Sequence, residues 1–256
     1  MLENLPPVFG QALSGQRAGL DQIVFNLVDL GPGTAAITVT SAAFIDHAPI
    51  PQRYTADGEG ETPPLTWNGV PSAAAALALI VEDADSPTPH PVVHLLVVDL
   101  PAVDGDAAAN ALAEDPAEAV EPAPTPGAMS AAAPQAAPSA SSPARGDAIA
   151  DDAETDGNRE GTAIARTGLN SLLGSGWLPP DPPPGHGVHR YAFQVFALGP
   201  DAAFSATPGR DELIEAIRQH GLASGLLIGT YARDTQVTER ADAVTAPAVG
   251  PAGLAS

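Results

Sequence analysis

The chain has 256 residues, no cysteine and a formal net charge of −21. This length suits one large domain or two small ones, and the lack of cysteine excludes disulfides, thiolate metal ligands and cysteine nucleophiles. The negative charge argues against nucleic acids as partners and against general attraction to anionic membranes, because both need a basic surface. The sequence has no basic leader followed by an apolar segment and no apolar run of about eighteen residues. We therefore expect a cytoplasmic protein without stable membrane insertion.

The N-terminal residues 1–34 are predicted to be an extension that packs on the domain. Their leucines are compatible with one or two short helical turns, although three glycines weaken the helical pattern. Residues 24–30 are apolar, and a short docked strand is an alternative for them. Strands are predicted at 35–44, 65–67, 74–81, 92–100, 191–198 and 226–231, with a further short one at 49–54. A helix over 210–220 places three aliphatic side chains on one face and ends at Gly221.

Residues 103–163 differ from the rest of the chain in composition. From Val103 to Gly161 they carry twelve acidic residues against two arginines and no aromatic residue. Such a segment buries too little apolar area to offset its ordering entropy. We predict a disordered insertion within one domain, whose two parts are residues 35–102 and 164–237. Residues 238–256 are predicted to be a disordered tail. Six to nine short strands and one helix indicate an all-β fold, an antiparallel sandwich with Greek-key-like connections and a peripheral C-terminal helix.

Two polar clusters interrupt the apolar strands. The first follows residues 77–81 and contains Glu82, Asp83 and Asp85, with His94 in the next strand. The second is PPPGHGVHRY, residues 182–191. Buried charges and imidazoles are costly unless they are paired, so the two clusters together indicate a polar pocket. One cluster alone would favour solvated acids beside a hydrogen-bonded core histidine.

Four motifs in order resemble those of the phosphatidylethanolamine-binding proteins, in particular their bacterial Raf-kinase-inhibitor-like branch. They are TPPLTW at 62–67, DADSP at 83–87, HLLVVDLP from His94, and GVHRY at 187–191. The resemblance extends from about residue 37 to residue 232, apart from the insertion. The chain departs from the family pattern at Ala84, where the family has proline, at Ser86, where it has alanine, and at Asp99, where it has asparagine.

The resemblance implies a non-enzymatic β-sandwich protein that binds phosphate or a phospholipid headgroup without a cofactor. The residues it assigns to ligand binding are Asp83, Asp85, His94, His189 and Tyr191, and those it assigns to support are Glu82, Pro87, Gly187 and Arg190. Two imidazoles and a tyrosine hydroxyl suit an anion as hydrogen-bond donors. Arg190, which alternates with its neighbours along a strand, is expected to point away from the pocket, towards Glu82 or Asp85.

Three other functions remain open at this point. His90 with His94, or His186 with His189, has a spacing that could bind a metal together with Asp83. A hydrolase could use the Asp–His pairs, although the sequence contains no nucleophile elbow, P-loop or dinucleotide fingerprint. Inhibition of a kinase or peptidase through surface loops is the third, with a protein partner that the sequence does not identify. His47, His90, His186 and His220 are interpreted as surface residues, and homodimer formation is left open.

Overall fold

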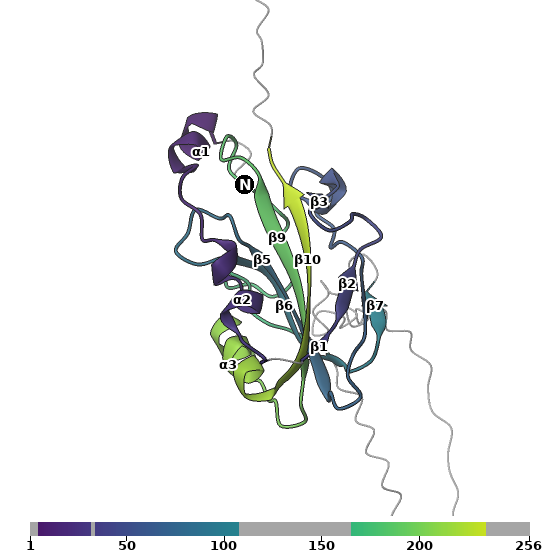
Figure 1. The fold of residues 1–256 in the computed structure, drawn as a ribbon. Coiled ribbons are helices and arrows are strands. Elements are labelled where there is room, and N and C mark those ends of the chain that lie inside the picture. Colours follow the sequence, from purple (N-terminus) through teal and green to yellow (C-terminus); the bar gives the residue numbers. More distant parts are fainter. Residues whose placement is uncertain (1–4, 32–33, 108–164, 234–256) are drawn as a thin grey trace, which may run out of the picture.

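A large β-sheet forms the centre of the protein, which we describe from a computed structural model at residues 5–31, 34–107 and 165–233 (Figure 1). The strands are β1 (Ala35–Ala36), β2 (Thr38–Thr40), β3 (Ala48–Pro49), β4 (Leu65–Asn68), β5 (Ala76–Asp83), β6 (Val92–Pro101), β7 (Gly105–Ala107), β8 (Arg166–Thr167), β9 (His189–Leu198) and β10 (Gly221–Tyr231). The α-helices are α1 (Pro7–Leu13), α2 (Val24–Leu27) and α3 (Arg210–His220), and short 3-10 turns cover Leu20–Gln22 and Gln52–Tyr54.

The large sheet has the strand order β1-β10-β9-β5-β6-β8, with β3 also paired to β10. Its central strands β5 and β9 are buried along almost their whole length, because both faces of the sheet are covered. Near-continuous apolar runs, rather than alternating ones, are the sequence pattern of such strands. The sheet is antiparallel except at one edge, where β1 and β3 run parallel to β10. The sequence predicts an antiparallel sandwich, and the parallel pairs are confined to this edge.

A second sheet, β2-β4-β7, packs on one face of the large sheet. The core between the two sheets contains Trp67 and Phe193 among its large side chains, and the indole of Trp67 donates to the carbonyl of Val103. Strand β7 pairs with β4, so regular structure continues through Ala107. The predicted disordered insertion therefore begins too early at Val103, because residues 105–107 complete the small sheet. The rest of the insertion, residues 108–163, and the predicted tail lie outside the described residues.

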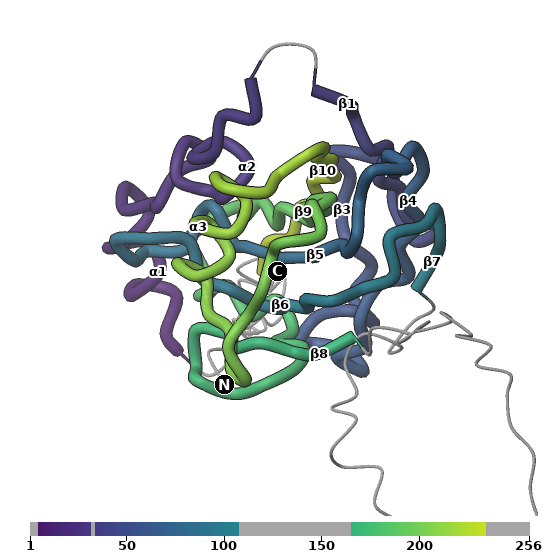
Figure 2. The backbone as a smooth tube through the Cα atoms, turned by 90° about the horizontal axis from the view of Figure 1, so that it is seen from below, coloured from purple at the N-terminus to yellow at the C-terminus, as the bar shows by residue number. Residues whose placement is uncertain are grey.

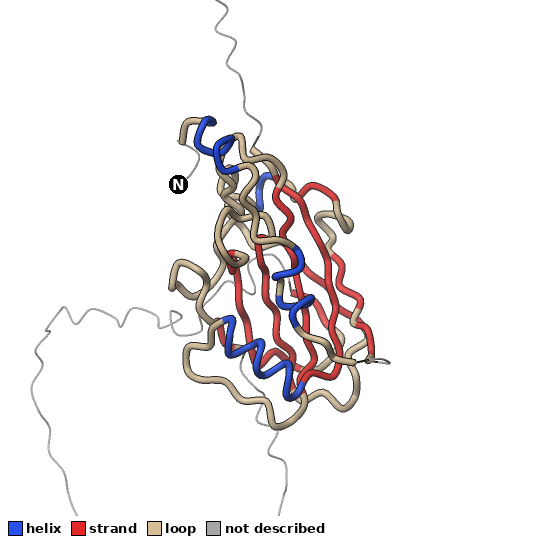
Figure 3. The backbone as a smooth tube through the Cα atoms, turned by 60° about the vertical axis from the view of Figure 1, so that its left-hand side comes forward, coloured by secondary structure: helices blue, strands red, loops and turns tan. Residues whose placement is uncertain are grey.

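Helices cover the opposite face of the large sheet, as Figures 2 and 3 show. Leu213, Ile214 and Ile217 of α3 pack with side chains of α2, β5, β6 and β9 in a second core. The helix begins and ends where the sequence predicts. Gly221, however, has φ −66° and ψ 130°, so it is not a left-handed cap. It leads directly into β10, and a side chain there would overlap the carbonyl oxygen of Ile217.

The N-terminal segment lies across the loops at the end of the large sheet where β9 begins (Figure 1). Ala18 N–H donates to the carbonyl of Ser86, and Gly19 N–H donates to that of Ala84. Among the described residues, the structure contains no helix long and apolar enough to cross a membrane.

Candidate functional site

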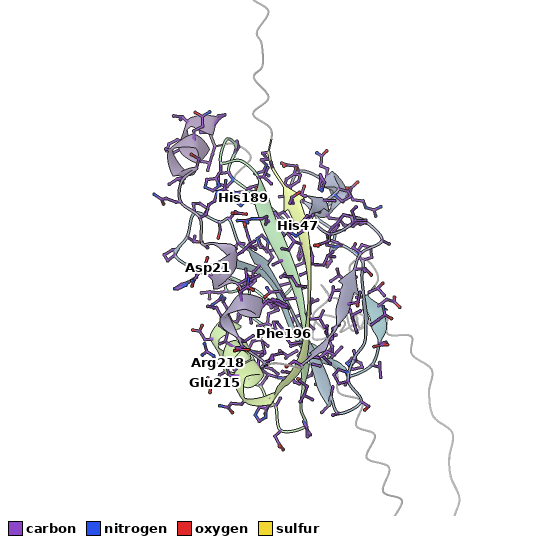
Figure 4. All side chains as sticks on the ribbon, viewed as in Figure 1. Asp21, His47, His189, Phe196, Glu215 and Arg218 are labelled. Atoms are coloured by element: carbon purple, nitrogen blue, oxygen red, sulfur yellow. The ribbon has the colours of Figure 1, made fainter. Side chains whose placement is uncertain are left out.

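The polar cluster occupies the edge of the sheet where β5 ends and β9 begins. Asp83, the last residue of β5, pairs with Tyr191, the third residue of β9. His189 opens β9 and pairs with Tyr231 at the end of β10. Figure 4 shows His189 at this end of β9, beneath α1, whereas Phe196 lies at the far end near α3. The fold thus brings both sequence clusters to one place.

His94 reaches the same site because β6 contains a β-bulge. Val81 pairs with Leu95 and Glu82 pairs with Val93, which leaves His94 as the extra residue. Strict alternation would turn His94 towards the helices together with Leu96 and Val98. Instead its ring contacts Tyr191 edge-on, with ring centroids 5.2 Å apart.

Asp83, His189 and His186 form a buried chain of hydrogen bonds. Nδ1 of His189 lies 2.7 Å from Oδ2 of Asp83, and its Nε2 lies 2.6 Å from Nδ1 of His186. Nε2 of His186 reaches the carbonyls of Leu13 and Gln16 at 2.9 and 3.2 Å. Because a carbonyl only accepts, His186 donates through Nε2–H. Burial lowers the pKa of His186, which favours the neutral ring, so its Nδ1 accepts a hydrogen bond from the Nε2–H of His189.

That chain engages both ring nitrogens of His189. The imidazole therefore holds Asp83 and His186 in position and has no nitrogen left for a ligand in this arrangement. A second oxygen of Asp83 accepts from the backbone N–H of Asp85 at 2.9 Å. Both carboxylate oxygens of Asp83 are consequently hydrogen-bonded within the protein, and the polar atoms without a partner lie on neighbouring side chains.

Four buried polar atoms around His94 and Tyr191 have no hydrogen-bond partner among the described residues. They are His94 Nε2, Tyr191 Oη, Trp177 Nε1 and Arg233 Nη2. The indole of Trp177 lies 6.1 Å from the imidazole of His94 between ring centroids. Leaving a buried donor or acceptor unpaired costs about 1–3 kcal/mol. Such groups, gathered on adjoining side chains, are typical of a ligand site.

The hydrogen bonds define the chemical character of His94. Its Nδ1 lies 2.5 Å from the carbonyl oxygen of Leu178, so Nδ1 carries the proton and donates. Burial lowers the pKa of His94, so the ring is neutral and its Nε2 is an acceptor. Burial also raises the pKa of Tyr191 well above its usual value, and Asp83 adds to the effect. The tyrosine is therefore a neutral hydroxyl that can donate.

Asp85 and Arg190 form a separate cluster together with Arg17. Two nitrogens of Arg190 bind the two oxygens of Asp85 at 2.7 Å each, and Arg17 reaches the same carboxylate at 3.0 Å. Burial opposes ionisation of Asp85, but hydrogen bonds from Arg190 and Arg17 outweigh it and hold the pKa of the carboxyl below its usual value. The side chain of Arg190 is directed to Asp85, as the strand pattern predicts. Asp85 thus holds the loop after β5 against Arg190 of β9, on the side of that strand opposite to His189 and Tyr191.

The other residues predicted to support the site belong to the scaffold around it. Glu82 is fully buried and accepts hydrogen bonds from Arg210, Gln194 and the backbone of Val24. It thereby ties the helical layer to the sheet. Gly187 has φ +99°, a left-handed conformation that glycine adopts without strain. Pro87 follows Ser86, whose hydroxyl donates to the carbonyl of Asp83.

Four residues of the site were not predicted as such. His186 was interpreted as a surface residue, which is wrong, because it is 1% exposed and bonded to His189. Arg17, Trp177 and Arg233 gave no recognisable signal in the sequence. Arg233 donates to Asp57 at 2.7 Å and to the carbonyl of Pro182 at 3.0 Å, and it pairs with Asp181. Among the other histidines, His47 and His90 are exposed and His220 is half-buried.

Two further features bear on the site's chemistry. In the described ranges, no group of three or more histidine, aspartate or glutamate side chains is arranged to hold a metal ion. A groove of about 440 Å³ lies elsewhere, between the β5–β6 loop and the start of α3, and shares no residue with the predicted ligand site. Its lining includes His90, Ser171 and Arg210, and this arginine is already bonded to Glu82.

Comparisons with known proteins assign the chain to one protein family. The family model of the phosphatidylethanolamine-binding proteins matches residues 40–232, and the chain belongs to this family. A UPF0098 protein from Methanothermobacter thermautotrophicus is 31% identical over 193 residues, which cover 75% of this chain and 95% of that protein. Another UPF0098 protein, from Chlamydia muridarum, is 30% identical and covers 77% of this chain and 99% of that protein.

Solved structures agree with this assignment. A putative phosphatidylethanolamine-binding protein homologue from Chlamydia trachomatis aligns with a TM-score of 0.54 and 28% identity, covering 78% of this chain and 99% of that one. YbcL of Escherichia coli shares the fold with the same TM-score, at 20% identity. The family and the strand-rich two-sheet fold predicted from the four motifs are thereby confirmed.

Proposed function

We propose that this protein is a non-enzymatic binding protein for a small oxyanion, either free phosphate or a phosphoethanolamine-type headgroup. The observation that carries the proposal is the pair of unpartnered buried atoms, His94 Nε2 and Tyr191 Oη, on rings in edge contact. A bound group that hydrogen-bonds to both would offset the cost of burying these two atoms without a partner. Membership of the phosphatidylethanolamine-binding family supports this ligand class.

The arrangement of the Asp83–His189 pair supports binding over hydrolysis. In a hydrolytic triad, the distal nitrogen of the histidine faces a nucleophilic hydroxyl or thiol. Here Nε2 of His189 faces Nδ1 of His186 at 2.6 Å. The hydroxyl of Ser86 donates to the carbonyl of Asp83 and contacts Thr88, so it is bonded to no base. The imidazole that would activate a nucleophile is engaged in holding the site together.

Titration calorimetry with inorganic phosphate and phosphoethanolamine tests the proposal. Tyr191→Phe keeps the buried ring and removes only the hydroxyl, so it should weaken binding by about 1.5–3 kcal/mol, the worth of a hydrogen bond to a charged group. His47→Ala, at an exposed site, is the matched control and should bind like the wild type. No measurable binding, or binding that Tyr191→Phe leaves unchanged, contradicts the proposed site. Release of phosphate from phosphoethanolamine would show an enzyme.

A further inference from the structure

We infer that the pocket selects the singly protonated, monoanionic form of a phosphate-type group, which gives its own O–H to His94 and accepts from Tyr191, Trp177 and Arg233. This inference rests on the proposed function and specifies its ligand. Trp177 and Arg233 thereby become ligand-contacting residues, which neither the motifs nor the family match assigns.

The first step is the pattern of donors and acceptors. Trp177 Nε1 and Arg233 Nη2 can only donate, and the neutral Tyr191 hydroxyl donates readily. Nε2 of the neutral His94 can only accept, because Nδ1–H is bonded to Leu178 at 2.5 Å. Three donors and one acceptor complement an oxyanion that retains one proton. A fully deprotonated oxyanion would place a lone pair against the lone pair of His94.

The second step is the position of Arg233, just beyond the end of β10 and close enough to Tyr191 for its charge to act on the hydroxyl. Its side chain is 7% exposed, and it lies two residues beyond Tyr231, the register partner of His189. Its charge acts on the hydroxyl of Tyr191, and that of its partner Asp181 acts on both Tyr191 and His94. Asp57 and Asp181 hold two faces of the guanidinium, which leaves Nη2 without a partner in the described chain.

The third step is the charge around the ligand position. Asp83, His189 and His186 form one hydrogen-bonded group. It holds one proton more than a carboxylate with two neutral imidazoles would, so this group of three side chains has no net charge. Asp57 and Asp181 carry two negative charges against the one positive charge of Arg233. Arg17 and Arg190 lie across the strand and are paired with Asp85. Burying a dianion beside two carboxylates is more costly than burying a monoanion.

The test measures affinity by calorimetry between pH 5 and pH 8 with four probes. Phosphoethanolamine and inorganic phosphate carry an ionisable P–OH, glycerophosphoethanolamine is a diester without one, and sulfate does not titrate. A phosphomonoester loses its second proton near pH ~6, so its affinity should fall about tenfold per pH unit above that value. Sulfate should bind weakly and without pH dependence. The diester should also bind weakly, which separates a free monoester from a lipid headgroup.

Variants distinguish the role of His94 from a general effect of pH on the protein. His94→Gln can present an N–H donor, so it should bind sulfate at least as well as phosphoethanolamine and lose most of the pH dependence. Trp177→Phe should lower the affinity for phosphoethanolamine about tenfold at pH 5. His90→Gln, on the exposed loop, is the control for both and should behave as the wild type.

The outcomes separate the two proposals. If none of the four probes binds, the proposed function itself fails. If sulfate or the diester binds as tightly as phosphoethanolamine, or if affinity is the same at pH 5 and pH 8, the pocket binds anions but does not select the protonated form. A pH dependence shared by sulfate would likewise overturn the inference, because it would arise from the protein.

Discussion

Nδ1 of His186 lies 2.6 Å from Nε2 of His189, and this contact joins the N-terminal segment to the candidate site. Through Nε2, His186 donates to the carbonyls of Leu13 and Gln16, while His189 holds Asp83. A residue between two glycines in a loop therefore connects two parts of the chain that are far apart in sequence. The imidazole is one link in a chain that runs from α1 to β5.

Replacing His186 should destabilise the fold. His186→Ala removes hydrogen bonds from His189 and from two carbonyls, and a buried group left unpaired costs about 1–3 kcal/mol. Urea unfolding of His186→Ala should show a loss in this range. His47→Ala, whose side chain is 61% exposed, should stay within about 0.5 kcal/mol of the wild type. Equal stability of the two variants would contradict the structural role of His186.

The two glycines of the N-terminal segment allow a matched test of its docking. A Cβ on Gly10 would overlap the carbonyl oxygen of Pro184, whereas a Cβ on Gly15 meets nothing within 4 Å. Gly10→Ala should therefore displace α1 and increase amide exchange in residues 7–19 and 184–188. Gly15→Ala should leave exchange in both regions unchanged. Identical exchange in the two variants would show that the segment does not depend on this close approach.

The Asp85 cluster should contribute more to stability than to ligand affinity. Asp85 is 1% exposed and pairs with Arg17 and Arg190, whose side chains are 31% and 36% exposed, and losing hydrogen bonds to charged groups costs about 1.5–3 kcal/mol. Asp85→Asn should lower the free energy of unfolding by roughly this amount. Arg190→Ala should lower it less, because Arg190 is 36% exposed and Arg17 remains. Phosphate affinity per folded molecule should change little in Arg190→Ala, and calorimetry that finds intact stability with abolished binding would refute this assignment.

Stability should fall as the pH drops below about 6.5, the ordinary pKa of histidine. Burial lowers the pKa of His94 and of His186 in the folded protein, so the unfolded chain binds protons that the folded chain does not. The free energy of unfolding then decreases with falling pH, by at most about 1.4 kcal/mol per pH unit for each histidine. In urea unfolding between pH 5 and pH 8, the free energy of unfolding should change less with pH for His94→Gln than for His47→Gln. The same pH dependence in both variants would contradict the neutral, buried state of His94.

The acidic insertion should be dispensable for folding. Replacing residues 110–160 with a short Gly/Ser linker keeps β7 and β8, and loop-closure entropy changes only slowly with loop length. The thermal midpoint should stay within a few degrees of the wild type. Loss of the cooperative transition would show that the insertion contributes to the core.

Local sequence patterns were sufficient to predict the central strands and the helix α3. Strands β5, β6 and β9 were predicted from their apolar runs, and α3 from the helical spacing of its aliphatic residues. Both patterns involve only residues that are close together in the sequence. The motifs identified the family, and they contain Asp83, His94, His189 and Tyr191, which the fold brings together at one end of the large sheet. The direction of Arg190 also followed from simple alternation along β9.

Which other residues join the candidate site is decided by contacts between segments that are distant in the sequence. Arg17, Trp177, His186 and Arg233 come from separate parts of the chain, and only the tertiary structure brings them beside β5 and β9. The bulge at His94 overrides strand alternation, and the carbonyl of Leu178 determines which nitrogen of its ring carries the proton. A residue type specifies which hydrogen bonds a side chain can make, but the groups that fold against it decide which of them it does make.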